Sequence, residues 1–154
     1  MHVAQPATRS NLREAMLTDH VSIERRLSRL VTAARMDDWD RLHAAWREVE
    51  RDLSAHLAAE EELMLPRFER YDAATAAKIR AQHARIRAQL EALGVDLDLH
   101  ALRVDAVEAF VARLKEHATG EERALYAWAQ ASLGEREKTS LLSRLKTRLR
   151  NAEA

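Results

Sequence analysis

Apolar residues recur every three or four positions along most of the chain, which is the spacing of one buried face of an α-helix. The pattern predicts a first helix over roughly residues 10–35, with Thr8 or Ser10 as its N-cap. Asp37 or Asp38 is placed to cap a second helix, which we expect to end near Pro66 because proline disrupts a helix interior. The first 66 residues therefore predict two long helices.

The rest of the chain repeats this organisation. A third helix is expected from a cap at Asp72 to a stop at Gly94, and a fourth from near Asp98 to Gly134. A shorter amphipathic helix follows over about residues 135–150. Four long helices with short connections favour an up-down antiparallel four-helix bundle. We therefore expect an all-α protein with a single domain over residues 1–154, its bundle spanning about 10–131 and the extra helix lying outside it.

Six polar residues occupy stripe positions where the helical pattern calls for apolar ones. They are His20, His56, Glu60, His83, His117 and Glu121. Burying a carboxylate without a partner costs several kcal/mol, so six such groups in one core need a common partner. Bound cations are the best explanation for two carboxylates that converge on four imidazoles, because a cation can be ligated by both kinds of group.

The spacing of these residues indicates how they could share a metal centre. His56 and Glu60, like His117 and Glu121, are four residues apart, so each pair projects from one helix face. One metal could take all six donors, but two metals bridged by the two glutamates, each with two histidines, is the more natural arrangement. Imidazole with carboxylate suits iron, with manganese or zinc as possible substitutes. Incomplete protein coordination would leave positions open to solvent, oxygen or peroxide.

A metal-free interpretation has to be weighed against this one. A lone histidine on an apolar face is usually a hydrogen-bonded core residue, and His-x-x-x-Glu is also a common spacing for surface ion pairs. The joint agreement of all six residues with the stripes favours the metal centre. The ferritin-like pattern, with glutamate three residues before histidine, does not occur at these four histidines.

Composition and charge narrow the function further. The 154 residues contain no cysteine, which excludes disulfides, thiolate-bound metals and thiol nucleophiles. The formal net charge is zero, which argues against a nucleic-acid partner. The sequence shows neither a signal peptide nor a run of apolar residues long enough to span a membrane, so we expect a cytoplasmic protein without a membrane partner.

The residues around these candidate ligands resemble the hemerythrin-like, or HHE cation-binding, family. The matching segments are Asp19-His20-Val-Ser-Ile23 with Leu27, His56-Leu-Ala-Ala-Glu60-Glu61-Glu-Leu-Met-Leu-Pro66, His83, and His117-Ala-Thr-Gly-Glu121-Glu122. The resemblance implies a four-helix bundle around a non-haem, oxo- or hydroxo-bridged pair of irons. It assigns His20 and His56 to one iron and His83 and His117 to the other, with Glu60 and Glu121 as bridges.

The sequence departs from the oxygen-carrying members of this family at two points. Those members end with a longer His-to-Asp spacing, where this chain has His117-x-x-x-Glu121, and they also differ at position 87. Those members have a fifth histidine one turn after the histidine of the third helix, and Arg87 stands there in this chain. Arg87 is therefore a candidate for a residue that lies behind the metal ligands or lines the ligand pocket, rather than for a metal ligand. Its positive charge could attract an anionic ligand such as peroxide. The change argues against reversible oxygen carriage.

Three functions remain open at this point. The leading hypothesis is a di-iron protein that binds or senses O2, NO or peroxide. The alternatives are an iron-dependent, peroxide-decomposing oxidoreductase and a metal-free helical interaction module. The basic C-terminal helix, with Leu141, Leu142, Leu145 and Leu149 on its apolar face, could bind a protein partner or a second copy, but we favour its docking on the bundle.

Overall fold

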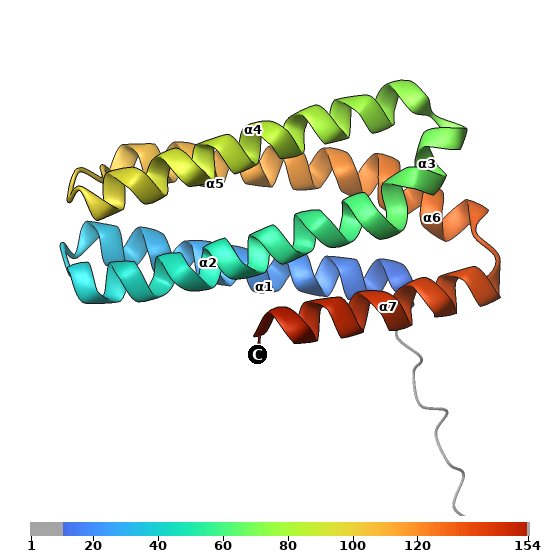
Figure 1. Ribbon diagram of the computed structural model, residues 1–154, viewed down its shortest axis with the longest axis horizontal. Helices are drawn as coiled ribbons and strands as arrows, with labels where there is room; N and C mark the ends of the chain where they lie inside the picture. The colour runs from blue at the N-terminus through green and yellow to red at the C-terminus, as the bar shows by residue number, and fades with distance from the viewer. Residues whose placement is uncertain (1–10, 154) are drawn as a thin grey trace, which may run out of the picture.

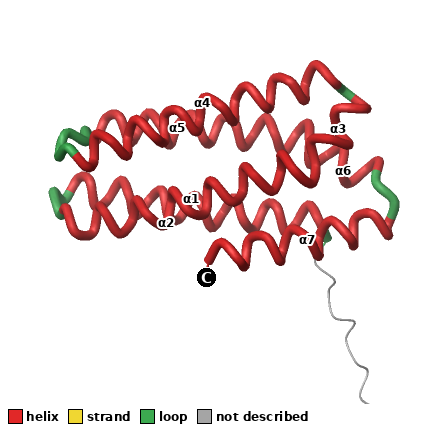
Figure 2. Tube along the Cα trace, viewed as in Figure 1, coloured by secondary structure: helices red, strands yellow, loops and turns green. Residues whose placement is uncertain are grey.

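The computed structural model describes residues 11–153 and shows an elongated bundle of helices (Figure 1). The long helices are α1 (Leu12–Arg35), α2 (Trp39–Ala59), α4 (Ala73–Asp98) and α5 (Val104–Glu121). Tight turns join α1 to α2 and α4 to α5 at one end of the bundle, so that consecutive long helices run antiparallel (Figures 1 and 2). The described residues contain no strand, and the predicted all-α bundle is confirmed.

The remaining helical segments begin at the opposite end of the bundle (Figure 1). They are the π-helical turn η1 (Glu60–Met64), α3 (Leu65–Tyr71), the π-helical turn η2 (Glu122–Tyr126), α6 (Ala127–Ser132) and α7 (Glu135–Glu153). The first two connect α2 to α4, and η2 and α6 extend α5. From there α7 folds back against α1 and α2.

Short polar side chains begin three of the long helices. Asn11 accepts a hydrogen bond from the backbone N–H of Glu14 at the start of α1, whereas Thr8 and Ser10, the expected caps, lie outside the described residues. Asp38 caps α2 and Asp72 caps α4, as the sequence predicted.

Two predicted helix boundaries are wrong, those at Gly94 and Asp98. Helix α4 continues through Gly94 and ends at Asp98, and α5 begins only at Val104. Gly94 lies against Trp46, whose ring would be 3.3 Å from a Cβ at this position, so the small residue permits close packing of α4 on α2. The chain turns at His100, which adopts a left-handed backbone conformation with φ of 53°.

The prediction that the second helix ends near Pro66 is also wrong. The wide turn η1 lies between α2 and α3, and the Leu65 N–H donates to the Glu60 carbonyl five residues earlier. Pro66 then falls in the first turn of α3, where a missing N–H is tolerated. The chain therefore remains helical past the proline.

The apolar core consists of two clusters with the polar candidate residues between them. The first cluster lies toward the tight turns and includes Leu30, Trp46 and Phe110. The second lies toward α3 and α6 and includes Met16 and Phe68. Along each long helix, the stripe passes from one cluster to the other at its polar residue; in α1, for example, Met16 precedes His20 and Ile23 follows it. The histidines and glutamates thus form one polar layer across the bundle.

Helix α7 docks on the second cluster through its leucine face. Leu141 and Leu145 are buried there, and Leu142 and Leu149 pack partly against it. This is the arrangement that the sequence favoured for the extra helix. None of the described helices is both long enough and apolar enough to span a membrane.

Candidate metal centre

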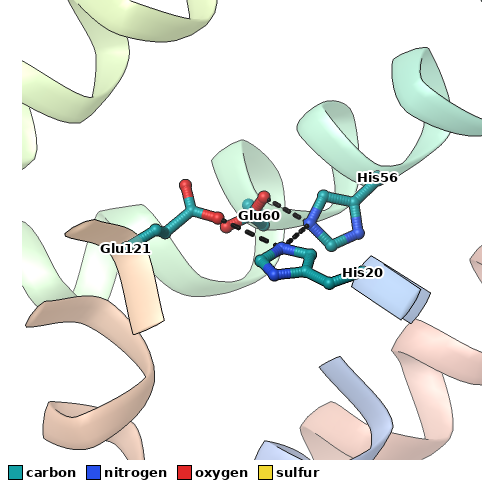
Figure 3. Close-up of side chains that lie close together, drawn as sticks. All are labelled: His20, His56, Glu60 and Glu121. Carbon is teal, nitrogen blue, oxygen red and sulfur yellow. Dashed lines mark hydrogen bonds and ion pairs between the residues drawn. The ribbon is translucent and has the colours of Figure 1, made fainter. Parts of the chain in front are cut away.

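The polar layer brings all six candidate ligands together in two groups. The first group contains His20, His56, Glu60 and Glu121, and the second contains His83, His117 and Glu121. In each group the potential donor atoms lie within 4.8 Å of one another. Figure 3 shows the side chains of the first group pointing toward one another; they come from α1, α2, η1 and α5. Glu121 therefore belongs to both groups, and Glu60 only to the first.

Close contacts define the first group. The Nε2 atoms of His20 and His56 are 2.9 Å apart, and His56 Nε2 lies 2.7 Å from Glu60 Oε1. Glu121 Oε1 lies 3.6 Å from His20 Nε2 (Figure 3). The i,i+4 spacing from the last turn of α2 into η1 places His56 and Glu60 on one face, as expected.

The second group is built around the other oxygen of the shared carboxylate. Glu121 Oε2 lies 2.9 Å from His117 Nε2 and 3.1 Å from His83 Nε2. The two histidine rings meet edge to face, with centroids 5.0 Å apart. One carboxylate thus joins the four histidines in two pairs, His20 with His56 and His83 with His117.

Each of the four histidines uses its Nδ1 for a polar partner outside these groups and turns Nε2 inward. The Nδ1 contacts are His56 with Asp19 at 2.5 Å, His83 with Glu61 at 3.2 Å, His117 with Gln82 at 2.9 Å, and His20 with Glu122 at 3.0 Å. Such outer partners orient the ring and raise its basicity toward a metal. The sequence analysis did not identify Asp19, Gln82 or Glu122 in this role.

Arg87 acts through Glu61 rather than at the centre itself. Its two terminal nitrogens donate to the two Glu61 oxygens at 2.5 and 2.7 Å, and Glu61 in turn contacts His83. Burial alone would raise the pKa of Glu61, but the hydrogen bonds and charge of Arg87, with His83, lower it below its ordinary value. Glu61 is therefore held as a carboxylate behind His83.

Tyr126 is a further residue of the centre that the sequence analysis missed. Its side chain is buried, and its hydroxyl oxygen lies 2.7 Å from His20 Nε2 and 3.2 Å from His56 Nε2. It is also 3.2 Å from Glu121 Oε1 and 3.4 Å from Glu60 Oε2. Burial, together with the two carboxylates, raises the pKa of this phenol well above its ordinary value.

The two buried glutamates are strongly coupled. Burial and the neighbouring Glu121 raise the pKa of Glu60 well above its ordinary value. Burial would also raise the pKa of Glu121, but hydrogen bonds from Glu60 and from three histidines hold it well below. Burial alone would lower the pKa of His56, but Glu60 and Asp19 outweigh it and raise that pKa. The raised pKa values of Glu60 and His56 mean that, without a cation, protons on these two residues offset the negative charge of the buried carboxylates.

The donor set fits a cation. Glu60 Oε1 and His117 Nε2 are buried and make no well-aligned hydrogen bond, although each lies within 3 Å of a polar atom of its own group, His56 Nε2 for the first and Glu121 Oε2 for the second. Unsatisfied buried polar atoms of this kind are uncommon in folded proteins, and a bound ion accounts for them. Imidazole nitrogens with carboxylate oxygens are ligands typical of first-row transition metals.

A small cavity of about 40 Å³ adjoins the centre between α1, α2 and α5. Half of its lining residues are apolar: Ile23, Leu27, Leu53, Leu57, Leu114 and Ala118. The other half are histidines of both groups and charged residues: His20, His56, His117, Glu24, Lys115 and Glu121. Arg87 is not part of this wall. The cavity has room for a molecule of a few atoms and none for a larger organic substrate.

The fold and the site together define a helical bundle with a buried cation-binding centre. The family model for the hemerythrin HHE cation binding domain matches residues 11–129, and a second match covers residues 74–152. The chain belongs to this family, as its sequence motifs indicated. No curated protein and no solved structure matched the chain.

Proposed function

We propose that this protein binds two irons and uses them to bind or sense O2, NO or peroxide. His20, His56 and Glu60 would hold one iron, His83 and His117 the other, and Glu121 would join the two. The observation that carries this proposal is that the two oxygens of Glu121 face histidines of different groups, Oε1 toward His20 and Oε2 toward His83 and His117. Manganese or zinc could use the same ligands.

The chain's own residues set the properties of such a centre. The Nδ1 partners hold the four imidazoles with Nε2 inward, so the ligands are oriented before a metal binds. The two apolar clusters on either side exclude water from the polar layer. Bound iron would supply open coordination positions and redox activity for a diatomic ligand or peroxide.

The size and lining of the adjoining cavity support a small ligand. A space of about 40 Å³ lined by Leu27, Leu53 and Leu114 favours uncharged diatomic molecules, which enter apolar cavities readily. Arg87, which the sequence suggested as an attractor of anions, is instead engaged by Glu61 and lies outside the cavity wall. These features favour binding or sensing over an enzyme that selects an organic substrate.

The proposal is tested by metal content and spin coupling. Protein purified without chelator, or reconstituted with Fe(II) and oxidised, should contain about two irons per chain. Two Fe(III) ions in an oxo- or hydroxo-bridged pair would couple antiferromagnetically and give no EPR signal at low temperature, whereas two separate ions would give one. A protein that binds one iron or none after reconstitution would contradict the proposal.

Addition of NO and peroxide separates the two iron-based functions. The reduced protein should bind NO with a saturable change in its optical spectrum. Sustained evolution of oxygen from added peroxide, over many turnovers per centre, would favour the peroxide-decomposing oxidoreductase instead.

A further inference from the structure

Tyr126 lies where a metal ligand would lie, although it belongs to none of the motifs that define the family resemblance. Its phenolic oxygen makes four contacts of 2.7–3.4 Å, one with each residue of the first group. No other hydrogen-bond partner of this hydroxyl is seen among the described residues. The oxygen is therefore held entirely by the atoms that would surround a cation.

The spacing of these atoms matches one coordination sphere. Ligands at about 2.1 Å from a metal and at right angles to each other are about 3 Å apart. The distances within the first group, 2.9 Å between His20 and His56 and 2.7 Å between His56 and Glu60, lie close to this value. The Tyr126 oxygen stands at the same spacing from His20 and His56, at 2.7 and 3.2 Å. The Tyr126 oxygen therefore stands at the distance from the other donor atoms that a further ligand of the same cation would have.

The π-helical turn η2 explains how Tyr126 reaches this position. In a regular α-helix, a residue five positions after Glu121 would point about 140° away from it. A π-helical turn pairs residues five apart and brings them toward one face. Because η2 spans Glu122–Tyr126, the phenol turns back toward the Glu121 carboxylate and lies 3.2 Å from it.

We propose that the phenolic oxygen of Tyr126 is a ligand of the cation held by His20, His56, Glu60 and Glu121. The phenol binds as phenolate, and its proton leaves to solvent as the O–metal bond forms. This inference rests on the proposed iron centre and assigns the two irons different ligand sets, because the second group of His83, His117 and Glu121 has no phenol. The first iron would be the harder to reduce, since an anionic ligand stabilises Fe(III) over Fe(II).

The test uses the fact that the chain contains only two tyrosines. Tyr71 is exposed and lies on α3, so in the Tyr71→Phe variant Tyr126 is the sole tyrosine. Loaded with Fe(III), this variant should show a phenolate-to-iron charge-transfer band in the visible region. Resonance Raman excitation within that band should enhance tyrosine ring modes, and these should shift when the protein is made with ring-deuterated tyrosine.

The Tyr126→Phe variant provides the matched comparison, because phenylalanine keeps the ring that packs in the second cluster. It should lose the visible band and the enhanced ring modes completely. Iron-loaded Tyr71→Phe protein without tyrosinate modes would overturn the inference and leave the iron centre intact. A wild-type protein that binds no iron would instead overturn the proposed function, and this ligand assignment with it.

Discussion

The two buried glutamates should contribute unequally to metal binding, because Glu121 belongs to both groups and Glu60 to one. We compare Glu121→Gln with Glu60→Gln, since glutamine keeps the size of the side chain and removes its charge. Glu121→Gln takes the carboxylate from His20 on one side and from His83 and His117 on the other. Glu60→Gln takes one carboxylate from the first group alone. We therefore expect about two irons in the wild type, about one in Glu60→Gln and fewer than one in Glu121→Gln.

Thermal stability gives the magnitude of this difference. A metal present at 100 times its dissociation constant stabilises the folded protein by about 2.7 kcal/mol per site. For a chain of this length, 1 kcal/mol corresponds to about 2–4 °C in Tm. Each occupied site should therefore raise Tm by about 5–11 °C above the value in chelator. The wild type should show two such increments, Glu60→Gln one, and Glu121→Gln almost none.

The assay is the difference in Tm between metal-loaded and chelator-treated samples of each variant, together with iron content by mass spectrometry. Taking the difference cancels any effect of the substitution on the metal-free protein. Glu50→Gln, at an exposed position of α2, is the matched control and should behave as the wild type. If Glu121→Gln keeps the same metal-dependent increment as Glu60→Gln, Glu121 is not the shared ligand.

Three further outcomes follow from the structure. Iron affinity should fall as pH decreases through the raised pKa values of His56 and Glu60, because their protons must leave when a cation binds. The fall should be about tenfold per pH unit for each proton displaced. Calorimetry in buffers of different ionisation enthalpy counts these protons, and none released would contradict the reasoning. Ala118→Leu should fill the small cavity and slow NO binding at unchanged iron content in stopped-flow experiments, whereas Ala112→Leu, at an exposed position of the same helix, should not. Removal of the residues after Gly134 should leave iron binding unchanged. It should lower the free energy of unfolding by about 3–6 kcal/mol in urea titrations, because the buried Leu141 and Leu145 are lost. An unchanged unfolding midpoint would show that α7 adds nothing to the core.

The helical periodicity was enough to predict the bundle and to locate the polar layer. The apolar stripes are interrupted by polar residues at His20, at His83 and at the two His-x-x-x-Glu pairs. This pattern can be recognised even when the helix boundaries are placed slightly wrongly, because it depends only on spacing within each helix. The ends of α4 and α5 could not be placed in the same way. From sequence alone, Gly94 predicts the end of a helix. In the structure it lies inside α4, where its lack of a side chain makes room for the Trp46 ring of α2. The sequence near Gly94 does not show which neighbouring helix packs there.

Tyr126 could not be predicted by periodicity for a related reason. A regular helix through residue 126 turns the phenol away from Glu121, and the phenol reaches the centre only because η2 widens the turn. The corresponding turn η1 begins at Glu60, and the chain continues through it into α3 instead of ending its helix near Pro66. Both π-helical turns begin at a candidate ligand or directly after one, a location at which such turns are often found in functional sites.

The outer partners of the histidines form a closed ring that explains why the centre can be ordered before a cation arrives. Each partner stands next to a candidate ligand in the sequence, yet it contacts a histidine on the following helix. The contacts run from Asp19 on α1 to His56, from Glu61 after α2 to His83, from Gln82 on α4 to His117, and from Glu122 after α5 back to His20. Because every long helix both gives and receives one contact, displacing any helix would disturb two imidazoles at once. The polar residue next to each candidate ligand in the sequence therefore indicates this ring of contacts. Its histidine partner can be predicted only once the order of the helices around the bundle is known.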